Sequence, residues 1–110
     1  MVRYTNEQMK KDLKVFLSKV KKKYPLEKAL LFGSRARGDY FLDSDVDVVL
    51  VSEAFQGRIT ERMGEMMFLW TAPVDLEPLC YTSEEFKKKK KQIGIVQQAV
   101  KEGVDLTAMA

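Results

Sequence analysis

The spacing of apolar residues predicts two amphipathic helices in the first two thirds of the chain. Over residues 4–23 apolar positions recur every three or four residues, with Thr5 and Gln8 in a capping-box arrangement and Pro25 beyond the end. The same spacing returns over residues 58–70, where the apolar stripe is rich in methionine. This stripe consists of Ile59, Met63, Met66, Met67 and Trp70. We interpret it as part of the core; a groove for a cofactor or partner is the alternative.

Three shorter segments have the apolar character of strands. Residues 27–32 form a run that ends at Gly33, and residues 73–81 form another. Residues 46–51 are almost wholly apolar and β-branched, which is typical of a strand covered on both faces. The segments between and around these three strands are therefore expected to supply helices that cover the sheet.

The C-terminal part of the chain has helical patterns. Thr82 and Glu85 form a second capping-box pattern, which predicts a helix through the lysine run at 87–91. A final amphipathic helix is expected to end at Gly103, with a kink or break near Gly94. Its apolar face consists of Ile93, Val96, Ala99 and Val100.

The order of the expected elements indicates the fold class. Helix, strand, short helix, strand, helix, strand and helix follow one another along the chain. This order predicts an α/β or α+β fold, with a small mixed β-sheet flanked by helices. Residues 1–110 contain no internal repeat and no interdomain linker, so we expect a single domain.

Composition narrows the chemistry that the chain can perform. It has 110 residues, 45% hydrophobic and 32% charged, which is typical of a folded globular protein. No apolar run approaches the roughly 18 residues of a membrane span, and the N-terminus lacks an export-signal pattern. Cys80 is the single cysteine, so a reducing, cytoplasmic location is expected, and we interpret this thiol as a core group. The absence of histidine excludes Ser–His and Cys–His catalysis and histidine metal sites.

The formal net charge of +3 depends on one segment. Residues 87–91 are five consecutive lysines, and without them the 14 remaining basic residues face 16 acidic ones, a balance of −2. Consecutive helical residues point around the helix, so the run makes no single face that tracks phosphates. We interpret it as a solvated helix segment, and nucleic-acid binding through it is the less favoured alternative.

Three aspartates stand at the beginning of the segment 46–51. Asp45 and Asp47 are two residues apart, so on a strand their carboxylates project to the same side. Like charges at that separation raise each other's pKa unless a cation lies between them. Mg²⁺ prefers carboxylate oxygens together with substrate phosphates and water. The alternative is a polar turn before the strand, a role that suits Asp43 and Ser44.

Asp75 is a further acid within the strand-like segment 73–81. If this strand lies beside the first acidic strand, Asp75 can join Asp45 and Asp47. Three converging carboxylates can hold two Mg²⁺ ions for in-line attack on phosphorus. Glu77 shares the strand face of Asp75, so it either assists or replaces Asp75 or is a solvent-facing edge residue.

The turn after the first strand is suited to binding an anion. Gly33 lets the backbone approach a ligand closely, and Ser34 adds a hydroxyl at the start of a helix. Arg35 and Arg37 are two residues apart, so on a helix they cannot both face one ligand. We expect Arg37 to bind phosphate and Arg35 to pair at the surface. The spacing is not that of a P-loop.

Together these motifs resemble the minimal nucleotidyltransferases of the DNA polymerase β superfamily. The resemblance rests on "GSRARG" followed by "SDVDVVL" and a later strand acid, and it extends over residues 28–79. It implies that Gly33 and Ser34 bind a nucleoside triphosphate. It also implies that Asp45 and Asp47 bind magnesium, and that Asp75 binds metal or activates the attacking hydroxyl. The family fold, a mixed sheet flanked by helices, agrees with the expected order of elements.

The resemblance also implies a reaction and a partner. The expected reaction is transfer of AMP from ATP, or of NMP from another NTP, to an acceptor hydroxyl with release of pyrophosphate and two Mg²⁺ ions as cofactors. Minimal family members pair with small helical HEPN proteins as antitoxins that add AMP to the toxin, which makes a HEPN-type partner the favoured acceptor. The competing hypothesis is a catalytically silent antitoxin or nucleotide-binding module that acts by contact alone.

Overall fold

The computed structural model describes residues 2–109, which form five helices and four strands. In chain order the elements are α1 (Asn6–Lys23), β1 (Lys28–Phe32), α2 (Ser34–Arg37), β2 (Val46–Val51), α3 (Ile59–Leu69), β3 (Leu76–Tyr81), α4 (Ser83–Lys90), α5 (Ile95–Glu102) and β4 (Val104–Asp105). The predicted order is therefore present, and the short strand β4 is an addition that the sequence pattern did not indicate.

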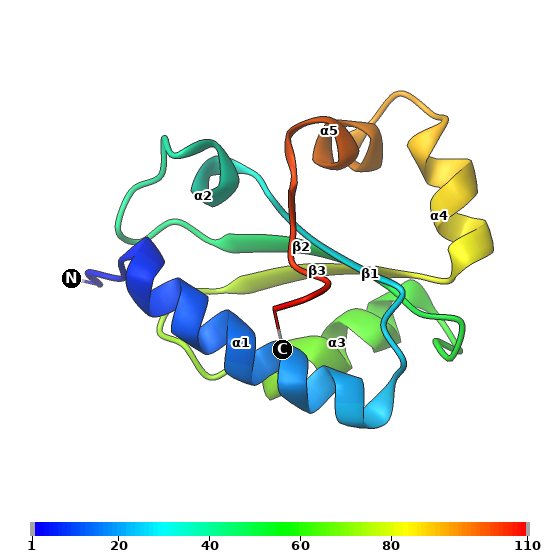
Figure 1. The fold of residues 1–110 in the computed structure, drawn as a ribbon, viewed down its shortest axis with the longest axis horizontal. Coiled ribbons are helices and arrows are strands. Elements are labelled where there is room, and N and C mark those ends of the chain that lie inside the picture. Colours follow the sequence, from blue (N-terminus) through cyan, green and yellow to red (C-terminus); the bar gives the residue numbers. More distant parts are fainter. Residues whose placement is uncertain (1, 110) are drawn as a thin grey trace.

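The four strands form one mixed sheet in the order β3–β2–β1–β4. β1 pairs antiparallel with β2 and with β4, whereas β2 and β3 are parallel. Helices cover both faces: α1 and α3 lie on one side of the sheet, and α2, α4 and α5 lie on the other (Figure 1). This arrangement confirms the predicted α+β class with a small mixed sheet flanked by helices.

Strand β2 lies between the two apolar cores of the molecule. Val46 and Val48 belong to the larger core under α1 and α3, and Val49 and Val51 belong to the smaller core beside α4 and α5. Five of the six residues of β2 are buried, and Asp47 is the partly exposed exception. Coverage on both faces explains why the sequence of this strand is nearly continuous in apolar residues.

Both predicted capping boxes are present. In the first, the Gln8 amide donates to Thr5 Oγ1 at 3.2 Å, and the Thr5 amide donates to Gln8 Oε1 at 2.9 Å. In the second, Thr82 and Glu85 make the same reciprocal pair at the start of α4. Each box satisfies amides that would otherwise lack partners in the first helical turn, so these helix starts are encoded locally.

The methionine stripe of α3 is only partly core. Met66 is fully buried, but Met67 is half exposed. Helix α3 packs against β3, which is the edge strand of the sheet, so no further strand extends the covered surface beyond it. The expectation that the whole stripe is buried is therefore wrong for its outer part.

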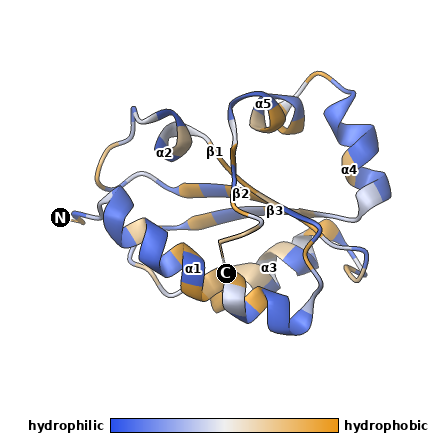
Figure 2. Cartoon of the chain, in the orientation of Figure 1, coloured by the Kyte–Doolittle hydropathy of each residue, from blue (hydrophilic) through white to orange (hydrophobic). Residues whose placement is uncertain are grey.

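A turn at residues 91–94 separates α4 from α5, as the glycine in this segment predicted. Helix α5 begins at Ile95, so Ile93 lies in the turn and is exposed, and Val100 is also exposed. The expected apolar face thus consists of Val96 and Ala99 only. Helix α4 is largely hydrophilic, as its colouring shows (Figure 2). Within residues 2–109, no helix has the length and apolar character needed to cross a membrane.

Candidate functional site

The acidic residues gather at one end of the parallel pair β2–β3. The register places Asp47 directly opposite Glu77, and the Val46 amide donates to the Asp75 carbonyl at 2.9 Å. Because Val46 is buried under α1 and α3, its neighbours Asp45 and Asp47 project to the opposite face. Residues that are paired across two strands share a face, so Glu77 lies on the face of Asp47, and the charges of Glu77 and Asp75 act on Asp45. We call these four residues the acidic cluster.

Two carboxylates of the acidic cluster, Asp45 and Asp47, have raised pKa values. Burial, a hydrogen bond with Glu77 and the charges of Glu77 and Asp45 raise the pKa of Asp47 to about 6, and Arg37 offsets part of this shift. The pKa of Asp45 is also raised, first by burial and then by the charges of Glu77 and Asp75. The carboxylates therefore repel one another, and the charges of Arg35 and Arg37 offset only part of this repulsion.

The donor set of the acidic cluster suits a hard divalent cation. No three Asp, Glu, Cys or His side chains within residues 2–109 form a preassembled metal-binding group. Mg²⁺ does not require one, because it is commonly held by one or two carboxylates together with substrate phosphates and water. Asp45 and Asp47 supply two such carboxylates, and a cation beside them would offset the repulsion from neighbouring acids that contributes to their raised pKa values.

Gly33 brings the turn before α2 against Asp47. A Cβ at Gly33 would lie 2.3 Å from Asp47 Oδ2, so a side chain here would require the carboxylate to move. The backbone also has φ = 74°, in the left-handed region that favours glycine. Ser34 follows as the first residue of α2 and is half-buried. The structure thus brings together the two motifs that the sequence separates by ten residues.

Arg35 does not pair at the surface, contrary to expectation. Its side chain is 2% exposed and donates hydrogen bonds to the backbone carbonyls of Tyr4 and Ser44, each at 3.0 Å. Its guanidinium also lies 5.1 Å from the Tyr4 ring centroid and 4.8 Å from that of Tyr40. Arg35 is a structural residue that joins α2 to the N-terminal segment and the loop before β2.

Arg37 points away from this interior, and its side chain is 45% exposed. Its Nη1 donates to Glu102 Oε1 at 3.0 Å, and its Nε lies 3.3 Å from Asp39 Oδ1. The Gly33 amide donates to the same Glu102 oxygen at 3.3 Å. Sequence reasoning missed Glu102, because this contact joins α5 to a turn 69 residues earlier and no local pattern marks it.

An apolar groove opens beside the acidic cluster. Its volume is about 300 Å³, and Glu77 lines it together with residues of β1, α3, β3 and the start of α5. The apolar lining residues are Phe32, Met63, Met67, Leu76, Leu79 and Ile95. The outer methionines of α3 therefore face a ligand-sized space rather than the core, as the alternative interpretation of the stripe allowed.

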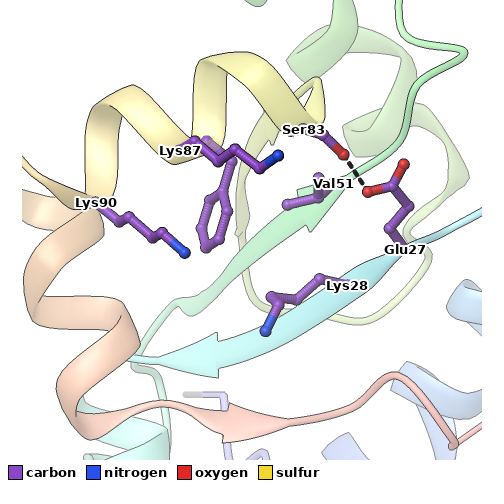
Figure 3. Close-up of a pocket in the computed structure, with 7 residues that line it drawn as sticks. Glu27, Lys28, Val51, Ser83, Lys87 and Lys90 are labelled. Atoms are coloured by element: carbon purple, nitrogen blue, oxygen red, sulfur yellow. Dashed lines mark hydrogen bonds between the residues drawn. The ribbon is translucent and has the colours of Figure 1, made fainter.

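The lysine run at residues 87–91 lies away from the acidic cluster. Lys87 and Lys90 extend with Lys28 toward a second cavity of about 190 Å³ between α4 and the start of β1 (Figure 3). Lys28 begins β1 and Gly33 follows its end, so this cavity is at the opposite end of the strand from the glycine turn. Ser83 hydrogen-bonds to Glu27 at its rim. The lysines therefore do not belong to the acidic cluster.

Cys80 is a buried free thiol on β3. Burial raises its pKa to about 12, so the thiolate is scarcely populated at neutral pH. This supports the interpretation of Cys80 as a core residue rather than a nucleophile.

Comparisons with known proteins match the part of the chain that contains the glycine turn and the acidic cluster. A family model described as "Nucleotidyltransferase domain" matches residues 13–107. "Putative protein adenylyltransferase" of Methanocaldococcus jannaschii is 28% identical over 95 residues, covering 84% of this chain and 92% of the relative. A crystal structure of "a putative nucleotidyltransferase from Sulfolobus solfataricus" matches with a TM-score of 0.65 and 26% identity, covering 90% of this chain and 79% of that chain. The family match spans both the glycine turn and the acidic cluster.

Proposed function

Because the chain belongs to the nucleotidyltransferase domain family, we propose that it transfers AMP from ATP to an acceptor hydroxyl with release of pyrophosphate. The observation that carries this proposal is the contact between Gly33 and the Asp47 carboxylate. This contact places the glycine turn, which is suited to binding phosphate, next to the β2 carboxylate, which is suited to binding a cation. Asp45 and Asp47 would hold Mg²⁺, while Gly33, Ser34 and Arg37 would bind the triphosphate.

The proposed step is an in-line displacement at the α-phosphorus. The acceptor oxygen forms a bond to the α-phosphorus, the bond to the bridging α–β oxygen breaks, and pyrophosphate leaves with that electron pair. Bound Mg²⁺ would neutralise phosphate charge and orient the phosphates. The protein's part is to position the triphosphate at the glycine turn and to accept the acceptor's proton on a carboxylate.

Two acids compete for the role of proton acceptor. We assign Asp75 as the third acid of the site, and we add Glu77 as a second candidate, because its register places it opposite Asp47. Both side chains are exposed and are therefore reachable by an acceptor. The isosteric variants Asp75→Asn and Glu77→Gln separate the roles, since loss of the proton acceptor should lower kcat more than it raises the KM for ATP.

We propose a protein as the acceptor, with a HEPN-type helical protein as the favoured partner. Support comes from the Methanocaldococcus jannaschii relative named "Putative protein adenylyltransferase", which matches over 92% of its own length. The apolar groove beside Glu77 offers a surface next to the acidic cluster where an acceptor chain can lie.

Label transfer tests the function directly. Wild-type protein is incubated with Mg²⁺, ATP labelled at the α-phosphate, and the protein that co-purifies with it from its host. We expect label on that protein, and Asp47→Asn should reduce the transfer about 100-fold or more, because the carboxylate that supports the metal is lost.

Glu84→Gln on α4 is the control, since it removes one negative charge from a side chain that is 83% exposed and lies away from the acidic cluster. It should transfer label at the wild-type rate. Full activity of Asp47→Asn would contradict the metal assignment. Tight partner binding without any transfer would instead support the catalytically silent module.

A further inference from the structure

Glu102 is the last residue of α5, and its carboxylate makes three hydrogen bonds. Glu102 Oε1 accepts from the Gly33 amide at 3.3 Å and from Arg37 Nη1 at 3.0 Å. Glu102 Oε2 accepts from Gln98 Nε2, one helical turn earlier, at 3.1 Å. The side chain of Glu102 is 17% exposed and that of Arg37 is 45% exposed, so a ligand can reach these bonds from solvent.

Both donors of Oε1 are groups that the proposed function assigns to nucleotide phosphate. An anionic oxygen of a carboxylate and one of a phosphate accept the same charge-assisted hydrogen bonds. The Gly33 amide and Arg37 are thus already bonded to an internal anion. These hydrogen bonds, that of Gln98 first, also lower the pKa of Glu102, so the group is ionised at neutral pH. Its negative charge lies at the place where the triphosphate is proposed to bind.

We propose that Glu102 occupies a phosphate subsite at the Gly33 turn, and that a nucleotide phosphate must displace this carboxylate in order to bind. Glu102 would therefore determine nucleotide affinity by competing for Gly33 and Arg37. This inference rests on the proposed function. It adds a residue whose carboxylate weakens the binding of the nucleotide.

The end of α5 is held in place, so displacement falls to the Glu102 side chain. A Cβ at Gly103 would lie 2.2 Å from the Ala99 carbonyl oxygen and 3.2 Å from that of Leu31. Val96 and Ala99 are buried in the smaller core. The backbone that carries Glu102 is thus packed closely against the sheet, whereas the side chain can leave the donors by rotating about its own bonds.

The variant Glu102→Gln tests the proposal, because glutamine keeps the shape but removes the charge. Binding is measured by isothermal titration calorimetry with Mg²⁺–ATP and, separately, with inorganic tripolyphosphate. The variant should bind both ligands about three- to tenfold more tightly, the ratio expected when a charge-assisted bond no longer has to be broken. Tripolyphosphate reports on the phosphate subsite without any contribution from the base.

Thermal unfolding supplies a second readout, because structural damage would lower the Tm without enlarging the rise in Tm that the ligand produces. Without ligand, Glu102→Gln should melt at a lower temperature than wild type, because the ion pair with Arg37 is lost. With Mg²⁺–ATP the variant should show the larger ligand-induced rise in Tm. The matched control is Glu84→Gln on α4, whose side chain is 83% exposed and which loses the same charge far from Gly33. It should leave both affinities unchanged.

The possible outcomes separate this inference from the proposed function. Weaker binding by Glu102→Gln would overturn the inference and show that Glu102 orients Arg37 for phosphate. Unchanged binding would overturn it as well, because displacement would then cost nothing. In both cases wild-type binding of Mg²⁺–ATP would leave the proposed function standing. If neither protein binds either ligand, the proposed function fails and the inference fails with it.

Discussion

Asp47 is an acid in a strand that is otherwise apolar, and the fold does not neutralise it. Burial and its contact with Glu77 raise its pKa to about 6, and Arg37 offsets only part of that shift. A strand that served only the core would be more stable with an uncharged residue at this position. The cost in stability is typical of a group that acts on a ligand, and here the ligand expected from the donor set is a cation.

We expect Asp47→Asn to raise the free energy of unfolding of the metal-free protein at pH 7. The variant removes an ionised carboxylate from a partly buried, negatively charged position, and after allowance for solvent screening the gain should be about 1 kcal/mol. Urea unfolding in the presence of a chelator measures it. Mg²⁺ should stabilise wild type but not the variant. A variant less stable than wild type would contradict the repulsion described for the acidic cluster.

Helix α2 shows how one short element separates two similar residues. Arg35 and Arg37 are two residues apart in this four-residue helix, so they leave it in different directions. Arg35 is buried against the backbone of the N-terminal segment and of the loop before β2, whereas Arg37 reaches Glu102 on α5. Arg35 therefore holds α2 in place, and Arg37 lies on the side of α2 where the nucleotide phosphate is proposed to bind.

Arg35→Met and Arg37→Met form a matched pair for this element. Arg35→Met leaves several carbonyls without their donor in a buried place, and we expect it to lower the free energy of unfolding by about 3 kcal/mol. Arg37→Met should lower it by only a small fraction of that amount, because its ion pairs are largely exposed. Urea unfolding followed by the fluorescence of Trp70, the single tryptophan, measures both. Equal effects would show that Arg35 is not the structural residue.

At the scale of the whole molecule, five acids with displaced pKa values form two groups with opposite effects on the pH dependence of stability. Asp45 and Asp47 have raised pKa values, first because of burial. Glu85, Glu102 and Asp105 have lowered pKa values, first because of hydrogen bonds from neighbouring side chains. The first group favours the folded state when it is protonated, and the second favours it when it is ionised.

These two groups predict a stability maximum in mildly acidic solution. Between pH 7 and about 5 the folded protein takes up protons at Asp47 before the unfolded chain does, so the stability of the metal-free protein should rise as the pH falls. Below about pH 4 the unfolded chain binds more protons at the acids with lowered pKa, and stability should decline. Thermal unfolding over this range measures the profile. Asp47→Asn should lack most of the rise, and a steady loss from pH 7 downward in wild type would rule out the raised pKa.

The sequence by itself determined the features that depend on neighbouring residues. Periodicity located the helices and the three longer strands, reciprocal Thr–Gln and Thr–Glu pairs located two helix starts, and the spacing of Asp45 and Asp47 placed both on one strand face. Each of these features is set by interactions within about four residues along the chain, where the backbone geometry of a helix or strand is known in advance. The glycine turn was predictable for the same reason.

Only the tertiary structure decided which distant groups meet. The register between β2 and β3 put Glu77 opposite Asp47, and packing sent Arg35 inward while Arg37 met Glu102. A shift of one residue in that register would turn Glu77 to the other face without changing the sequence pattern of either strand. Contacts between segments many residues apart depend on how elements pack, and periodicity along one segment carries no information about its partner.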